Sequence, residues 1–181
     1  SDATEETSNQ EEKRVEERTA EILEVSKELE LYYLAAEHAE SGVWYFNISN
    51  GTAKYDEILL DMYGLDRKKY ADFVPFQIWK ERIHPEDRKA TTKSLLKSIE
   101  KGEKWDRLFR IILPDSNTVK YIRGKGRVEY GKDGNPDVAF GTNWDVTREM
   151  QLSEERQIAL DHLKETQAQI VQSEKMASLG I

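Results

Sequence analysis

Cysteine is absent from this chain of 181 residues, and its absence excludes several classes of protein. Disulfide frameworks, metal sites with thiolate ligands and thiol nucleophiles all need a cysteine side chain. Long apolar runs are missing too, since no stretch approaches the roughly 20 residues that a transmembrane helix needs. The first five residues, SDATE, do not have the pattern of a signal peptide. We therefore expect a cytoplasmic protein with no membrane contact in these residues, and a membrane anchor upstream of residue 1 stays open.

Basic residues are fewer than acidic ones in this chain. Lys and Arg total 27 against 35 Asp and Glu, which gives a net charge of −8 and argues against a nucleic-acid-binding protein. Eleven of the acids and only four of the bases fall in residues 1–30, so the rest of the chain is nearly neutral. Residues 1–10 are small and polar and are expected to be a disordered leader.

Glycine and proline are both absent from residues 11–41, where apolar side chains follow helical spacing. Apolar residues recur at heptad positions, which predicts a long amphipathic helix with a narrow apolar seam. The seam consists of Val15, Ile22, Val25, Leu29 and Tyr32. Two interpretations are open: the helix pairs with a second copy in a coiled coil, or it lies alone on its own domain.

The spacing changes to two at Gly42, where Trp44, Phe46 and Ile48 alternate with polar or half-polar positions. This alternation predicts a strand, and Asn50-Gly51 predicts a hairpin to a second strand at 52–55. Short helices are expected over 56–64, 76–83 and 85–102, the last burying Leu95, Leu96 and Ile99.

Three longer strands are expected at 105–113, 118–130 and 136–144. Gly124 and Gly126 interrupt the second of these and indicate a bulge or a close backbone approach. Val138, Phe140, Thr142 and Trp144 share one face of the third. Because strands and helices are segregated, the prediction is an α+β fold with a five-stranded antiparallel sheet and short helices on one face.

Residues 148–181 return to helical spacing, with Leu163 and Ile170 on a second heptad seam. The alternate seam positions are polar, so a coiled coil here is weak and tolerates two registers, with either Ala159 or Leu160. Such bistability suits a signal transmitter, although a merely short or poor coil has the same pattern.

Residues 41–149 resemble a PAS sensor domain. The resemblance rests on seven short stretches in the family's order: 42–44 (GVW), 62–65 (MYGL), 83–88 (IHPEDR), 109–111 (FRI), 121–127 (YIRGKGR), 133–134 (DG) and 141–147 (GTNWDVT). One departure is Asp115-Ser116-Asn117, where the family usually has an Asp-Gly turn. The resemblance implies a PAS fold over 42–147 between flanking coiled-coil helices.

Residues 172–180, QSEKMASLG, are similar to the start of the dimerisation helix of sensor histidine kinases. The family's phosphoacceptor motif follows none of His38, His84 and His162. The resemblance therefore implies the sensory and dimerisation module of a two-component kinase, without enzymatic activity in these residues. Its implied partners are a second copy, a kinase domain in the same chain and a response regulator.

Within the PAS-like region, a small ligand is expected between the sheet and the helices of residues 56–101. The candidate pocket consists of Leu59, Tyr63, Trp79, Ile83, Leu95, Phe109, Ile111 and Tyr121. The same side chains fill a plain core equally well, in which case the domain relays without a ligand. The four tryptophans (Trp44, Trp79, Trp105 and Trp144) either stack on a flavin or belong to the core.

Two alternatives concern cofactors and catalysis. A flavin- or haem-bearing redox or gas sensor stays open, except that a flavoprotein forming a cysteinyl adduct is excluded. His84 precedes Pro85 at the start of a helix, and this position favours a capping role for His84 over that of a haem or metal ligand. A small isomerase-like enzyme would need a buried acid or His, and the expected strands place no acid on an apolar face.

The junction Asp145-Val146-Thr147 stands between the last strand and the exit helix. The start of a helix leaves four N–H groups without helical partners, and Asp145 is expected to cap the helix by accepting from them. The same bond couples the sheet to the helix, so we expect this junction to relay signals, with Arg148 as an ion-pair partner of Asp145.

Overall fold

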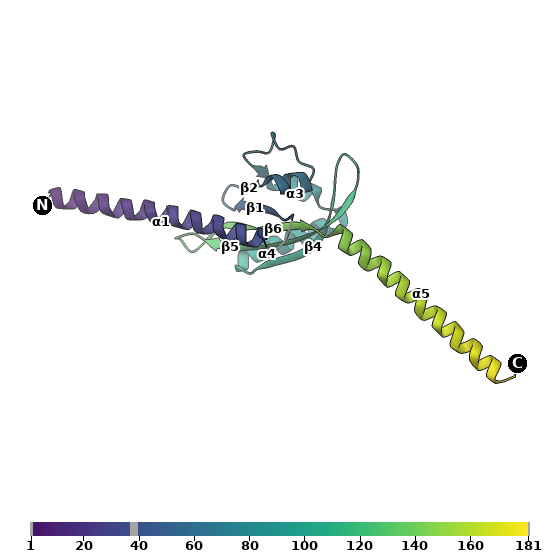
Figure 1. The fold of residues 1–181 in the computed structure, drawn as a ribbon. Helices are drawn as coiled ribbons and strands as arrows, with labels where there is room; N and C mark the ends of the chain where they lie inside the picture. The colour runs from purple at the N-terminus through teal and green to yellow at the C-terminus, as the bar shows by residue number, and fades with distance from the viewer. Residues whose placement is uncertain (1, 37–39, 181) are drawn as a thin grey trace.

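The computed structural model describes residues 2–36 and 40–180 and, within the first helix, the side chains of residues 6–24 and 26–28. A central α+β domain lies between two long helices that leave it at opposite ends (Figure 1). These are α1, Asp2–Ala36, and α5, Thr147–Ser178. The helix α1 begins at Asp2, so residues 2–10, which were expected to belong to a disordered leader, are helical.

The central sheet is antiparallel and has six strands in the order β3-β2-β1-β6-β5-β4. Their bounds are β1 Gly42–Asn47, β2 Thr52–Tyr55, β3 Val74–Pro75, β4 Trp105–Ile112, β5 Val119–Tyr130 and β6 Pro136–Asp145. The expected five-stranded sheet is therefore wrong by one strand. The additional strand, β3, pairs only Val74 and Pro75 with β2 at the sheet edge. Two residues carry no periodicity, and a proline is tolerated at an edge because its missing N–H faces no partner strand.

The inner face of the sheet carries three helices and the main core. These are α2 Glu57–Met62, α3 Phe76–Arg82 and α4 Pro85–Lys101. Gly42 lies directly under α2, because an added Cβ would come within 2.6 Å of Leu59 Cβ. Leu95 and Ile99 of α4 are buried as expected, but Leu96 is 48% exposed. At 100° per residue Leu96 points away from the sheet, beside the solvent face of α4.

The outer face of the sheet is covered by α1, which packs along β6 and β1. Phe140 and Thr142 point to this face and are 0% and 2% exposed. Lys27 of α1 lies 3.0 Å from a carboxylate oxygen of Glu129 on β5. The C-terminal part of α1 therefore lies on its own domain, which is one of the two interpretations that the sequence left open.

Two local predictions concern turns and caps. His84 is the N-cap of α4, and its Nδ1 accepts a hydrogen bond from the backbone N–H of Glu86 at 3.3 Å, which confirms the capping role. Asn117 has φ +53°, the left-handed conformation that glycine usually supplies, so the hairpin between β4 and β5 forms without the Asp-Gly turn.

Candidate functional site

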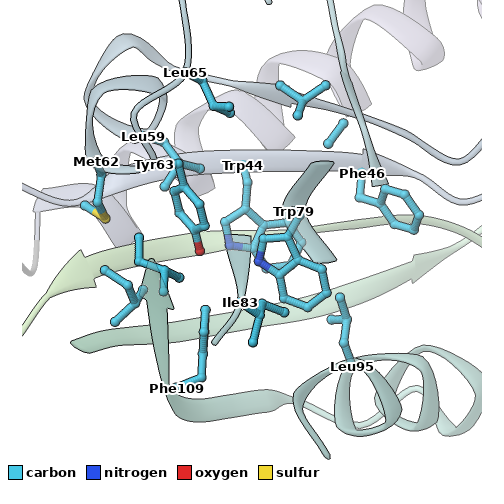
Figure 2. Packing of buried hydrophobic residues seen from close by; sticks show 14 of the residues in the cluster. Trp44, Phe46, Leu59, Met62, Tyr63, Leu65, Trp79, Ile83, Leu95 and Phe109 are labelled. Carbon is cyan, nitrogen blue, oxygen red and sulfur yellow. The ribbon is translucent and has the colours of Figure 1, made fainter. Parts of the chain in front are cut away.

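The centre of the inner core holds a small aromatic cavity. Trp44 of β1, Trp79 of α3 and Trp105 of β4 meet there nearly edge to face, with ring centroids 6.1 and 6.3 Å from Trp105. Trp44, Phe46, Trp79 and Leu95, which line the cavity, are among the buried side chains labelled in Figure 2. The cavity measures about 30 Å³ and is lined by Trp44, Phe46, Ala53, Tyr55, Phe76, Trp79, Leu95, Trp105 and Asn143.

A buried polar network borders this cavity. The Oδ1 of Asn143 accepts a hydrogen bond from Trp44 Nε1 at 3.0 Å, and its Nδ2 donates to the Tyr63 hydroxyl at 2.8 Å. Asn143 is 3% exposed and Tyr63 is fully buried. Burial raises the pKa of Tyr63, so its hydroxyl stays neutral. One amide thus ties β6 to β1 and to the end of α2.

Most of the predicted pocket residues do not line the cavity. Only Trp79 and Leu95 do so. The others form the packed core around it, namely Leu59, Tyr63, Ile83, Phe109 and Ile111. Tyr121 is half-buried on β5, where its carbonyl accepts from Val146 N–H at 2.9 Å. The structure therefore places Tyr121 at the junction with α5 and not in the pocket.

The size of the cavity limits what it can hold. A volume of about 30 Å³ accommodates roughly one or two water molecules. An isoalloxazine ring or a haem does not fit among these side chains, because the three indoles occupy the space that such a ring needs. Trp144, the fourth tryptophan, lies outside the core cluster, with Lys125 Nζ 5.6 Å from its ring centroid.

The cavity also has little capacity for acid–base chemistry. Its polar lining consists of Asn143 and Tyr55, and burial raises the Tyr55 pKa well above its ordinary value. Among the side chains that the structure describes, no carboxylate or imidazole lines it. Among the described residues, no group of three or more His, Asp or Glu side chains is placed to hold a metal ion.

The junction between β6 and α5 is held by side chains from both elements. The N-cap of α5 is Val146, which has no side-chain cap hydrogen bond, so the cap expected at Asp145 is displaced by one residue. Asp145 Oδ1 accepts from the backbone N–H and the hydroxyl of Thr147, the first residue of the helix. Thr147 Oγ1 in turn accepts from the backbone N–H of Tyr121 on β5 at 2.9 Å. The start of α5 is thus hydrogen-bonded to two adjacent strands, β5 and β6.

The expected ion pair between Asp145 and Arg148 is wrong. The Oδ2 of Asp145 lies 3.3 Å from Lys120 Nζ on β5. Sequence proximity favoured Arg148, whereas strand pairing brings β5 beside the end of β6. Both side chains of the pair are about 30% exposed, so its contribution to stability is small, under about 1 kcal/mol.

The predicted seam residues of the two long helices face solvent wherever the structure describes them. Val15 and Ile22 of α1 are 63% and 68% exposed, and Leu163 and Ile170 of α5 are 59% and 52% exposed. Val25, Leu29 and Tyr32 lie in α1, but their side chains are outside the described residues, as is all of His38. No residue of α5 between Thr147 and Ser178 is buried in the single chain.

Sequence reasoning missed Asn143 and the bond from Tyr121 to Thr147. The available signal for Asn143 was its place on the same strand face as Ala139 and Gly141, the face turned toward the core. The backbone bond had no signal, because it depends on the register between β5 and β6.

Comparison with known proteins gives three kinds of similarity. A family model described as the PAS fold matches residues 53–143, about half of the chain. The probable diguanylate cyclase DgcE of Escherichia coli (strain K12) is 25% identical over 126 residues, which cover 70% of this chain and 11% of that protein. The chain therefore spans about a tenth of this relative's length.

Two solved structures have a similar fold. A sensory box histidine kinase/response regulator from Burkholderia thailandensis E264 superposes with a TM-score of 0.61 at 22% identity, covering 74% of this chain and 97% of that one. The N-terminal domain of a diguanylate cyclase with PAS/PAC sensor from Marinobacter aquaeolei gives 0.55 at 19% identity, covering 61% and 98%. Among the described residues, no helix has the length and apolar character that spanning a bilayer requires.

Proposed function

Since the chain belongs to the PAS-fold family, whose model spans residues 53–143, we propose that residues 1–181 are the sensory and dimerisation module of a two-component sensor histidine kinase. In this proposal the PAS sheet responds to a small ligand or a partner contact. The response passes through Asp145, Val146 and Thr147 into α5, which pairs with α5 of a second copy. The kinase domain lies further along the same chain and acts on a response regulator.

One observation carries the proposal: α5 is a helix of 32 residues with no buried residue. A helix gains most of its stability in proteins from packing an apolar face. Leu163 and Ile170 present such a face and are more than half exposed. A second α5 would cover this seam and would give the helix the packing that it lacks in the single chain.

The path from cavity to helix is short. Asn143 contacts the cavity, and Asp145 follows two residues later on β6. Two residues along a strand span about 6.6 Å. A ligand that displaces Trp44 would break the Trp44–Asn143 hydrogen bond and shift β6 at the point where α5 begins. It can bias α5 only if it binds the two sheet geometries with different affinity.

The kinase as the output rests on residues 172–180, which resemble the start of a kinase dimerisation helix and lie at the end of α5. The cavity size supports a small, uncharged ligand or none. It does not favour a flavin- or haem-based sensor, and purified protein is expected to show no visible absorbance band.

Pairing of α5 is tested by changing its seam. The double variant Leu163→Asp, Ile170→Asp places charge on the seam. At about 1 M salt, where contacts between exposed charges are screened, it is expected to lower the mass measured by light scattering from two chains to one. Val171→Asp is the matched control, because Val171 is 51% exposed but lies roughly 80–100° away from the seam on the helix. Equal masses for the seam variant and the control would refute the pairing.

The output is tested with a chimera that joins residues 1–180 to the dimerisation and catalytic domains of a histidine kinase. Each residue inserted after Glu165 rotates the downstream helix by about 100°. Autophosphorylation from labelled ATP is expected to change with one inserted residue and to recover with seven. Insertions in the turn at residues 131–135 serve as controls. An autophosphorylation rate that is the same with one and with seven inserted residues would contradict the proposal.

A diguanylate cyclase is the second candidate output, because two of the similar proteins are described as such enzymes. A chimera with a cyclase domain in place of the kinase distinguishes the two. The enzymatic activity that changes with one inserted residue in α5 and recovers with seven is the one that this module controls.

A further inference from the structure

The solvent face of α4 carries an uninterrupted line of lysines. Lys89, Lys93, Lys97 and Lys101 are four residues apart and all exposed. They line an open groove of about 800 Å³ together with Lys80, Arg88 and the exposed Leu96. We call this surface the lysine stripe. Its positive charge stands out in a chain whose net charge is −8.

The groove of the lysine stripe is lined by six bases and one acid, Glu100. Within the described residues, none of its four lysines forms an ion pair within 4.0 Å. The acids at the start of α4, Glu86 and Asp87, are bound instead by Arg110 at 2.8 and 2.7 Å. Like charges four residues apart on a helix destabilise it, and exposed helices commonly alternate Glu with Lys at this spacing. Six bases against one acid leave the groove positively charged, which favours an anionic partner.

The same chain contains a matching line of acids. Glu17, Glu21, Glu24 and Glu28 are spaced by four, three and four residues along α1, and all are exposed. At 1.5 Å per residue this acidic line is about 16 Å long, against about 18 Å for the lysine stripe. It lies roughly 140° around the helix from the seam of Val15 and Ile22, so pairing through that seam leaves the acids free.

The acidic line cannot reach the lysine stripe within one molecule. Lys27 holds α1 to Glu129 of β5. Burial raises the pKa of Tyr45, and the nearby carboxylate of Glu24 adds to this shift, so Glu24 lies close to Tyr45. Tyr45 faces the outer side of the sheet, whereas α4 covers the inner side. An acidic α1 on the lysine stripe must therefore come from another copy.

We propose that the lysine stripe of α4 docks the acidic line of α1 from a second copy of this chain, in a contact held by complementary charge. Leu96 adds an apolar anchor inside the groove. The contact is separate from the pairing of α5, which is apolar, so either can fail without the other. Because exposed charges carry it, the contact weakens with salt as the Debye length falls from about 30 Å at 0.01 M to 3 Å at 1 M.

Zero-length carbodiimide coupling tests the contact directly, since it joins only carboxylates and amines that touch. A mixture of ordinary and nitrogen-15-labelled full chain is coupled at low salt, digested and analysed by mass spectrometry. Mixed-isotope crosslinks between residues 17–28 and residues 89–101 are expected. Their absence, or crosslinks found only within one isotope, would overturn the proposal.

Charge reversal tests the same contact by light scattering, in the Leu163→Asp, Ile170→Asp background so that α5 does not contribute. Lys93→Glu, Lys97→Glu and Glu21→Lys, Glu24→Lys are each expected to weaken self-association by roughly tenfold or more at low salt. Mixing the two variants should restore it, since each then supplies the charge that the other lacks. Lys68→Glu, Lys132→Glu is the control with the same change of net charge at exposed positions.

Three results would decide against a second copy as the partner. One is a control variant that weakens association as much as the stripe variant, which indicates a net-charge effect. Another is no recovery on mixing. The third is a lysine stripe that binds a short DNA duplex or phosphatidylserine vesicles while crosslinks to α1 are absent.

Discussion

At the scale of single residues, the core depends on close approaches that only particular side chains permit. The indole of Trp44 lies over Gly126 and Gly141 of the neighbouring strands, and a Cβ added at Gly126 would meet the ring at 2.5 Å. Asn143 satisfies its hydrogen bonds beside the same ring. The position of Trp44 is thus fixed by packing on one side and by a hydrogen bond on the other.

Gly126→Ala is expected to destabilise the domain by about 1–3 kcal/mol, because the new methyl group displaces the Trp44 ring in a packed core. Denaturant unfolding followed by tryptophan fluorescence measures the change. Gly131→Ala is the control, since its nearest atom is the flexible Asp133 side chain at 3.0 Å. A change of less than about 0.5 kcal/mol at Gly126 would show that the ring has room to move.

Asp87 gives stability a dependence on pH. Its carboxylate accepts from the backbone N–H and the guanidinium of Arg110, and the hydrogen bond from that side chain holds the Asp87 pKa below its ordinary value. A depressed pKa stabilises the fold above the unfolded pKa of about 3.9, and this stabilisation is lost as pH falls through the folded pKa. The nearby charged groups are Arg110, Glu86 and His84.

We therefore expect Asp87→Asn to lower Tm at pH 5–7 and to converge with the unmodified protein as pH falls below about 4. Thermal unfolding monitored by circular dichroism from pH 7 to 2.5 measures the Tm difference at pH 5–7 and its loss at lower pH. Arg110→Met should give the same convergence. A Tm difference that stays constant across this range would show that the carboxylate does not carry the effect.

At the scale of elements, the junction of β6 with α5 decides whether the exit helix follows the sheet. Four hydrogen bonds converge there. The backbone N–H and the hydroxyl of Thr147 donate to Asp145, the Tyr121 N–H donates to Thr147, and the Val146 N–H donates to the Tyr121 carbonyl. Two strands therefore hold one helix start. The proposed coupling would therefore depend on β5 and β6 together and not on Asp145 alone.

Thr147→Val keeps the side-chain volume and removes the acceptor for Tyr121 N–H. The expected cost is about 1 kcal/mol, with faster hydrogen exchange at the Tyr121 amide. Thr166→Val is the matched control, because Thr166 donates only to the carbonyl of His162 on exposed α5. Unchanged protection of Tyr121 would mean that water replaces the lost bond without loosening the junction.

At the scale of the whole molecule, a packed domain stands between two helices that extend away from it (Figure 1). The domain buries its own apolar residues on both faces of the sheet. In contrast, the described part of α1 outside the domain and all of α5 leave their apolar side chains in solvent. The proposed assembly places its contacts on these helices.

The helicity of α5 is expected to depend on protein concentration. A single exposed helix is marginal in water, whereas a paired one is stabilised by its buried seam. The mean residue ellipticity at 222 nm should fall on dilution, in step with the mass measured by light scattering. Constant ellipticity over a range in which the mass halves would show that α5 is stable unpaired.

The sequence alone determined the local features. Alternation and helical spacing predicted an α+β fold with the strands in order, His84 as a cap and Asp145 at the start of the exit helix, because each depends on residues close together in the chain. The PAS resemblance agreed with that order, and the PAS family is now established, while the kinase context stays a proposal.

The tertiary structure decided what depends on residues distant in the chain. Strand register put Lys120, and not Arg148, beside Asp145. It also joined Asn143 to Trp44 and Tyr63, 99 and 80 residues away. The predicted pocket became mostly solid core, because the sequence gives side-chain volumes but not the space between elements. Apolar spacing, finally, does not say what an apolar face packs against, and only the fold showed α1 on the outer face of its own sheet.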